Sequence, residues 1–286
     1  TKIIYSLPFD KARNKIVLTR QDFPTIGFVA KQAERAGYEI CFVDDDVTQI
    51  ESWAAVIDER AAFVHITHAL SNTSHILPAQ EICALARKAG AVSIVDIAQS
   101  LGAAPVDIPA WQPDFVTGTG VKFLCAGPGA CFLYASPEML PRCAPIDVGW
   151  FSHENPFEMD IERFHYAPDA MRFFGGTPSP VPLAAANAAL DVWSDIGIKT
   201  VHKAIKGHIK TLTQKVPNDI LISPRADGPH GGTFVVAPKD RAKLRHAIKS
   251  NGLLCDERKE GFRFSVHGYT SGEEIARLSS IVADSL

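Results

Sequence analysis

VSIVDIAQSLGAAPVDI (92–108) and DFVTGTGVKFLCAGPGACFLY (114–134) are the two stretches that decide the fold. Each begins with a short apolar run, and each run is followed by a turn rich in glycine or alanine. Asp96 ends the first run, and Lys122 follows the second run, 26 positions after Asp96. Because the carboxyl ends of parallel strands face the ligand crevice of an α/β sheet, the pattern predicts that both side chains lie at such a crevice.

The neighbouring segments continue the same alternation of strand and helix. FVAKQAERAG (28–37) and PAQEICALARKAG (78–90) place apolar residues at helical spacing and end in glycine, a common residue at a helix C-terminus. Strands that alternate with such helices are typical of βαβ units, so we predict an α/β fold with a mainly parallel sheet and flanking helices. The predicted strands are KIVLT (15–19), YEICFVD (38–44), AAFVHITH (61–68), VSIVDIA (92–98), DFVTGTG (114–120) and GACFLYA (129–135).

The pattern changes after residue 136. Residues 137–180 are rich in proline, glycine and aromatic residues without a sustained period, which indicates long functional loops. Two long helices, a strand, a second strand, a helix, a third strand and a last helix are then expected. These segments are VPLAAANAALDVWSDIG (181–197), TVHKAIKGHIKTLTQKV (200–216), DILISP (219–224), GGTFVVAP (231–238), RAKLRHAIKSNG (241–252), GFRFSVH (261–267) and SGEEIARLSSIVADSL (271–286). We therefore expect a large domain over residues 1–198 and a small C-terminal α+β domain over residues 199–286.

Composition narrows the classes of function. Among 286 residues, 46% are hydrophobic and 21% are charged, with a net charge of -3, so no broad basic surface for nucleic acid or for an acidic membrane is indicated. No apolar run approaches the roughly 20 residues that span a bilayer, and we expect a cytoplasmic protein with a small-molecule partner. The six cysteines form no CxxC pair, which favours reduced thiols over zinc ligands or disulfides.

Asp96 and Lys122 suit one kind of cofactor chemistry. A carboxylate at the end of a buried strand can pair with a protonated ring nitrogen and keep that ring electron-withdrawing. The apolar, glycine-rich neighbours of Lys122 would desolvate its ammonium group and lower its pKa, as a nucleophilic lysine requires. Taken singly, Asp96 is better explained as a turn or cap residue and Lys122 as an exposed loop lysine. The two together favour a cofactor site.

A longer series of residues, in matching order, resembles a known family. The matching segments are Asp22-Phe23-Pro24-Thr25, Asp96-Ile97-Ala98-Gln99, Lys122, Cys125-Ala126-Gly127-Pro128-Gly129, Gly149-Trp150-Phe151-Ser152-His153, Arg172, Gly176-Thr177-Pro178, Asp256-Glu257-Arg258, Phe262-Arg263-Phe264 and Tyr269. With them the chain resembles the class V branch of the enzymes that depend on pyridoxal 5′-phosphate (PLP), and within this branch it is most similar to the kynureninases. The resemblance covers nearly the whole chain and implies the fold-type I architecture.

The resemblance also implies roles for individual residues. Lys122 would hold PLP as a Schiff base, and Asp96 would pair with the pyridinium nitrogen. Arg263 would bind the α-carboxylate of an amino-acid substrate through two parallel hydrogen bonds. The implied cofactor-binding residues are Phe23, Asp96, Gln99, Thr119, Lys122, Trp150 and Thr177. The implied substrate-binding residues are Phe151, His153 and Arg263.

A homodimer follows from the same resemblance. Trp150 and Thr177 look like the residues that reach across a dimer interface to the phosphate bound by the partner subunit. The active site would then lie at the subunit interface. The loop that cradles the phosphate in this family would lie upstream of Thr1, so we expect the large domain to lack its N-terminal part here.

Several positions depart from the kynureninase pattern. Val121 stands where a tyrosine precedes the lysine, and Ile26 stands where an aspartate follows the stacking phenylalanine. Val121 can neither donate a hydrogen bond nor relay a proton, so the reaction stays open. Gln99 stands where kynureninases usually have a histidine. A glutamine at this position is typical of cysteine desulfurases and selenocysteine lyases, which the chain resembles at this point. Their nucleophilic cysteine has one candidate here, Cys255, whose acidic neighbours would raise the pKa of its thiol.

We therefore expect a PLP-dependent enzyme that cleaves or hydrolyses the side chain of a kynurenine-like amino acid. Transamination, or a β-elimination like that of the desulfurases and selenocysteine lyases, is the alternative reaction. A non-catalytic member that keeps the fold as a dimerisation or regulatory module is an alternative of another class. Nucleotide binding on a Rossmann-like sheet is less favoured, because no GxGxxG follows the first strands.

Overall fold

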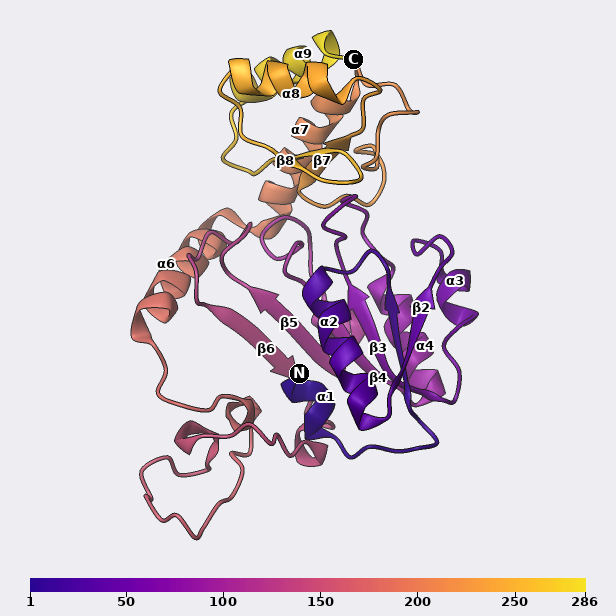
Figure 1. Ribbon diagram of the computed structural model, residues 1–286. Coiled ribbons are helices and arrows are strands. Elements are labelled where there is room, and N and C mark those ends of the chain that lie inside the picture. Colours follow the sequence, from indigo (N-terminus) through magenta and orange to yellow (C-terminus); the bar gives the residue numbers. More distant parts are fainter.

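Six strands form the main sheet of the computed structural model, which describes residues 1–286. Their order across the sheet is β2-β1-β3-β4-β5-β6, and only β6 runs antiparallel to its neighbour. The strands are β1 (Lys15–Thr19), β2 (Glu39–Val43), β3 (Ala61–Thr67), β4 (Val92–Asp96), β5 (Phe115–Thr119) and β6 (Cys131–Ala135). The predicted mainly parallel sheet is thus confirmed, and the carboxyl ends of β1 to β5 lie at one edge (Figure 1).

Helices cover both faces of this sheet. On the front face lie α1 (Lys2–Ser6) and α2 (Pro24–Ala33), the latter continued by the 3-10 turn η1 (Glu34–Ala36). On the back face lie α3 (Ile50–Ala54), α4 (Ala79–Ala89) and α5 (Ile108–Trp111). Figure 1 shows α2 before β3 and β4, with α4 behind them. Because side chains alternate along a strand, β3 sends Phe63 to the front core and Val64 to the back core.

The predicted loop region between β6 and α6 contains only three short 3-10 turns: η2 (Leu140–Arg142), η3 (Trp150–Ser152) and η4 (Ala170–Phe173). It extends away from the main sheet (Figure 1). Two long helices follow, α6 (Pro180–Ile196) and α7 (Ile198–Thr213). Gly197 joins them with a φ of 79°, a left-handed conformation that favours glycine.

A second, antiparallel sheet of three strands lies above the carboxyl ends of the main sheet (Figure 1). Its strands, in the order β7-β9-β8, are β7 (Thr233–Val236), β8 (Asp256–Glu257) and β9 (Phe262–Ser265). It packs with α7, α8 (Arg241–Ser250) and α9 (Gly272–Asp284) around a core of its own. The small α+β unit was expected, whereas its boundary near residue 198 stays a prediction.

The prediction of a strand over DILISP (219–224) was wrong. Only an isolated bridge between Leu221 and Val236 forms there. Pro217 and Pro224 flank the segment, and a proline has no N–H to extend a ladder of hydrogen bonds. The short elements α1, α3, α5 and β8 were not predicted, because two to five residues carry too little periodicity. No helix is long and apolar enough to cross a membrane.

Candidate active site at the carboxyl ends of the strands

Asp96 and Lys122 lie at the carboxyl ends of neighbouring strands, where the sequence predicts a crevice, and Lys122 lines a cavity there. Asp96 is the last residue of β4, and its Oδ1 atom accepts a hydrogen bond from the Ala98 N–H at 2.8 Å. Lys122 lies in the loop that follows β5, the next strand in the sheet. Gly102, with a φ of 87°, brings the turn after Gln99 against this loop. A Cβ at Gly102 would lie 2.5 Å from the carbonyl carbon of Phe123, so only glycine permits this approach.

The environment of Lys122 favours a reactive amine. Its Nζ atom lies 5.6 Å from the centre of the Phe23 ring. Burial lowers the pKa of Lys122 below its ordinary value; Asp96 opposes this shift, while Arg263 and Arg258 reinforce it by charge repulsion. A lower pKa leaves more of the amine unprotonated near neutral pH, which is the form that attacks a carbonyl carbon.

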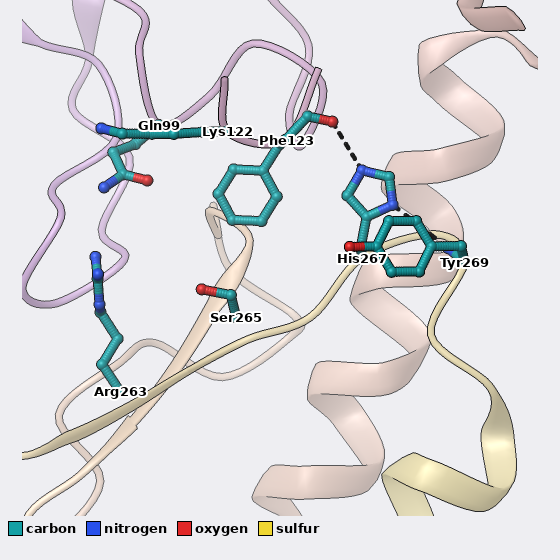
Figure 2. Close-up of a pocket in the computed structure, with 7 residues that line it drawn as sticks. All are labelled: Gln99, Lys122, Phe123, Arg263, Ser265, His267 and Tyr269. Atoms are coloured by element: carbon teal, nitrogen blue, oxygen red, sulfur yellow. Dashed lines mark hydrogen bonds between the residues drawn. The ribbon is translucent and has the colours of Figure 1, made fainter. Parts of the chain in front are cut away.

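A cavity of about 280 Å³ adjoins Lys122. Gln99 and Lys122 come from loops of the main sheet, and Arg263 reaches the same cavity from β9 of the second sheet. Figure 2 shows these three at one side of the cavity, with His267 and Tyr269 at the other. The lining residues are Gln99, Lys122, Phe123, Arg263, Ser265, His267 and Tyr269. The site is therefore built between the two sheets.

Both terminal nitrogens of Arg263 are held by polar contacts. Its Nη2 donates to Asp256 Oδ2 at 2.9 Å and its Nη1 donates to the Ser71 carbonyl at 2.9 Å. Its Nε is buried and has no hydrogen-bond partner. Arg263 lines the cavity, so its positive charge can attract a carboxylate there, and a forked pair of hydrogen bonds to that ligand would require its terminal nitrogens to release their present partners.

Arg263 forms the ion pair with Asp256 that the sequence offers as an alternative to a substrate contact, but the rest of the polar group around it was not predicted. Arg258 Nε donates to Asp256 Oδ2 at 2.6 Å, so both arginines share one carboxylate. Arg258 also donates to Ser71 Oγ, and Asn72 lies beside it in the loop after β3. The signal was present as polar Ser71 and Asn72 shortly after a buried strand, at the edge where ligands bind.

Two further predicted cofactor residues, Phe23 and Thr119, lie near Lys122, but they differ in how accessible they are to a ligand. Phe23 precedes α2 and is 43% exposed, so part of this residue is accessible to a ligand. Thr119 ends β5, but its hydroxyl lies 3.5 Å from both the Ala130 carbonyl and the Val121 N–H, within its own loop. The structure thus brings Phe23, Asp96, Gln99, Thr119, Lys122 and Arg263 to one end of the sheet.

The other predicted site residues lie in the long loop region. Trp150 is 38% exposed and packs edge-on against Phe151, with ring centres 4.8 Å apart. His153 is buried, and its Nδ1 accepts a hydrogen bond from the Asn155 N–H at 2.9 Å. Trp150 and His153 border a different cavity, and Thr177 lies just before α6. Within one chain, the structure does not bring these four residues to the Lys122 cavity.

The residues around Lys122 fit the PLP that the resemblance implies. An amine of lowered pKa borders the cavity, a strand-end carboxylate acts on it, and a partly exposed aromatic ring lies beside it. The positive charge of Arg263 at the cavity suits a carboxylate, as in an amino-acid substrate. No group of three or more histidine, cysteine, aspartate or glutamate side chains is arranged to hold a metal ion.

Comparison with known sequences agrees with this chemistry. The family model of the class-V aminotransferases matches residues 3–278. The chain is 35% identical to a kynureninase of Deinococcus radiodurans over 257 residues, which are 86% of this chain and 61% of that protein. It is 24% identical to an uncharacterized aminotransferase, YcbU, of Bacillus subtilis, over 92% of this chain and 70% of that protein. The chain thus spans less than two thirds of the kynureninase's length.

Comparison with solved structures shows the fold. A cysteine desulfurase of Thermococcus onnurineus superposes with a TM-score of 0.86 at 19% identity, over 96% of this chain and 73% of that chain. The cystine C-S lyase C-DES, in complex with cysteine persulfide, superposes with a TM-score of 0.83 at 23% identity, over 99% and 78%. A mutant of that lyase carries glycine covalently linked to its PLP cofactor. The architecture is that of the fold-type I PLP-dependent enzymes.

Proposed function

The chain belongs to the class-V aminotransferase family, whose enzymes use PLP, and from this premise we propose that Lys122 binds the cofactor covalently and that the protein acts on an amino acid. The observation that carries the proposal is the position of Lys122. Its partly buried amine, of lowered pKa, lies beside Phe23 and under the influence of Asp96. Gln99 borders the same cavity and would contact the ring hydroxyl of the cofactor.

Each residue at the site would have a separate task. When bound, PLP supplies an electron sink for negative charge at the substrate Cα. Asp96 would keep the ring nitrogen protonated, since a carboxylate stabilises a neighbouring cation. Arg263 would bind and orient the α-carboxylate, and the Lys122 amine would remove the proton from Cα. The small unit that carries Arg263 also contributes Ser265, His267 and Tyr269 to the cavity.

For the reaction, we propose cleavage or hydrolysis of the side chain of a kynurenine-like substrate. The 35% identity to a kynureninase and the segment from Gly149 to His153 support it. Val121 is 48% exposed directly before the lysine and offers no hydroxyl for proton transfer. This substitution favours transamination or β-elimination as the second candidate, in line with the similarity to an aminotransferase.

We also propose a homodimer with the active site at its interface. Large apolar side chains are exposed along the long loop region and α6. They include Ile146, Phe157, Met159, Ile161, Val181, Leu183 and Val192. Exposed apolar patches of this kind mark protein interfaces. In such a dimer Trp150 and Thr177 would serve the cofactor of the partner subunit, and Phe151 and His153 its substrate.

Borohydride reduction tests the cofactor proposal. Protein incubated with PLP and reduced should yield, after proteolysis, one peptide with a pyridoxyl adduct on Lys122. Lys122→Ala should carry no adduct, whereas the control Lys31→Ala, which removes an exposed lysine paired with Glu34, should be labelled like the wild type. A wild-type protein without an adduct on Lys122 would instead favour the non-catalytic module.

Product analysis distinguishes the candidate reactions. The PLP-loaded protein is mixed with kynurenine and with other amino acids, and anthranilate, alanine and keto acids are assayed separately. Anthranilate together with alanine supports hydrolysis, and keto acids without anthranilate support transamination or elimination. Val121→Tyr should increase anthranilate formation if the missing hydroxyl limits the hydrolysis.

A further inference from the structure

A buried polar cluster lies beside the candidate site, on the front face of the sheet. It consists of Asp22, in the turn after β1, and of His65 and Thr67 on β3. The exposed fractions of the Asp22 and His65 side chains are 2% and 8%. Neither residue has a role in the function proposed above. A carboxylate so far from water needs a compensating partner, so the contacts of Asp22 require an explanation.

Asp22 makes contacts through both of its oxygens. Its Oδ1 accepts a hydrogen bond from Thr67 Oγ1 at 2.6 Å, and its Oδ2 accepts one from the Thr19 N–H at 2.9 Å. The Nδ1 atom of His65 lies 3.4 Å from Oδ2, the separation of an ion pair rather than of an aligned hydrogen bond. Asp22 therefore ties the end of β1 to β3.

The charges of this cluster complement one another. Burial by itself would raise the pKa of Asp22, but His65, Thr67 and Thr19 outweigh it and hold that pKa below its ordinary value. Burial would likewise lower the pKa of His65, yet Asp22, helped by Asp96, raises it. The two side chains thus favour the charged form of each other.

The cluster is linked to both sides of the cofactor site. On one side, Asp22 directly precedes Phe23, and the Phe23 carbonyl accepts the Ile26 N–H at 2.8 Å in the first turn of α2. On the other side, Thr67 is the register partner of Asp96 in the pairing of β3 with β4. A shift of Asp22 would therefore move the ring of Phe23 relative to the carboxylate of Asp96.

We propose that Asp22 and His65 are positioning residues of the cofactor site: their buried ion pair fixes the distance between Phe23 and Asp96. This inference rests on the proposed function, because Phe23 and Asp96 matter together only if a planar, cationic ring lies between them. The pair acts through these two residues and makes no contact with the cofactor.

The test compares two buried histidines three positions apart. His65→Gln and Asp22→Asn remove the ion pair. The control His68→Gln changes a histidine that is equally buried but packs on Trp111 at the back of the sheet, with ring centres 4.4 Å apart. Each protein is titrated with PLP to obtain the dissociation constant, and the visible circular dichroism of bound PLP reports the asymmetry around its ring. Thermal unfolding without PLP reports stability separately.

His65→Gln and Asp22→Asn should weaken PLP binding by about tenfold or more, equivalent to about 1.4 kcal/mol, and should change the visible dichroism. The double variant should lose no more than either single variant, because both break the same pair. His68→Gln should lower the unfolding temperature and leave both cofactor readouts at their wild-type values.

A milder pair of variants covers the case in which His65→Gln does not fold. Thr67→Val keeps the volume of the side chain and removes only the hydrogen bond to Asp22, and Thr67→Ser restores the hydroxyl. The dichroism should change in the first and return in the second. Unchanged PLP binding and dichroism in all pair variants, or equal changes in His68→Gln, would overturn the positioning role while the Lys122 adduct stands. A wild-type protein that binds no PLP would overturn both proposals.

Discussion

The two faces of the main sheet differ most at the carboxyl end of β3. On the back face, Val64 and Ile66 join a sealed apolar core that includes Trp53 and Trp111. On the front face, His65 and Thr67 meet Asp22, and the neighbouring strand ends in Asp96. One strand thus serves two tasks through its alternation of side chains: the back stabilises the fold, and the front shapes a site. At the carboxyl ends of β3 and β4, polar side chains gather on the front face, next to the proposed cofactor site.

The largest effect of a substitution should be a loss of stability caused by a change in the core on the back face. Trp53 is fully buried, so Trp53→Ala should reduce the free energy of unfolding by about 3 to 5 kcal/mol through lost contacts and a cavity. Urea unfolding measures this loss. At low temperature, where the variant is folded, its affinity for PLP should equal that of the wild type. A weaker affinity for PLP in the folded variant would contradict the claim that the back face stabilises the fold without shaping the cofactor site.

A substitution at the candidate site should instead impair substrate binding and leave stability nearly unchanged. Arg263 is fixed by Asp256 and Ser71, and its substitution by glutamine removes charge-assisted hydrogen bonds to a substrate carboxylate, worth about 1.5 to 3 kcal/mol. Arg263→Gln should therefore raise KM for the amino acid about 10- to 100-fold, with little change in unfolding. The control Arg245→Gln removes an exposed arginine paired with Glu257 and should leave KM unchanged. An equal KM in wild type and Arg263→Gln would contradict the assignment.

The smallest effect concerns pH. The pKa of His65 is raised on folding, so its contribution to stability is complete below the ordinary histidine value near 6.5 and is lost as pH rises through the higher folded value. The pKa of Asp22 is lowered, so its contribution is complete above the ordinary aspartate value near 3.9 and is lost as pH falls below it. The stability difference between wild type and His65→Gln should thus be larger at pH 5.5 than at pH 8.5. His68→Gln should show no such increase toward low pH, since burial lowers the pKa of His68 to about 4.

Most of the main sheet could be predicted because its signals are local. The six strands from KIVLT to GACFLYA were each found within one or two residues at either end, as were the crossover helix α4 and the long helix α6. Asp96 and Lys122 could be placed as well, since a strand end fixes the edge at which a residue lies. DILISP was misjudged because apolar content alone does not reveal whether a paired strand can form beside prolines.

The residues along the chain were enough to predict most strands and helices and to place Asp96 and Lys122 at one edge of the sheet, because periodicity and strand ends are encoded in neighbouring residues. Tertiary structure alone decided which distant groups meet. It brought Arg258 and Arg263 against Ser71 from the loop after β3, and it paired Asp22 with His65 of β3. Such encounters depend on how sheets and loops pack, and pairs far apart in the chain leave no periodic signal. The residue types of the candidate site could be identified from the sequence, whereas the contacts that hold these residues in place became visible only in the structure.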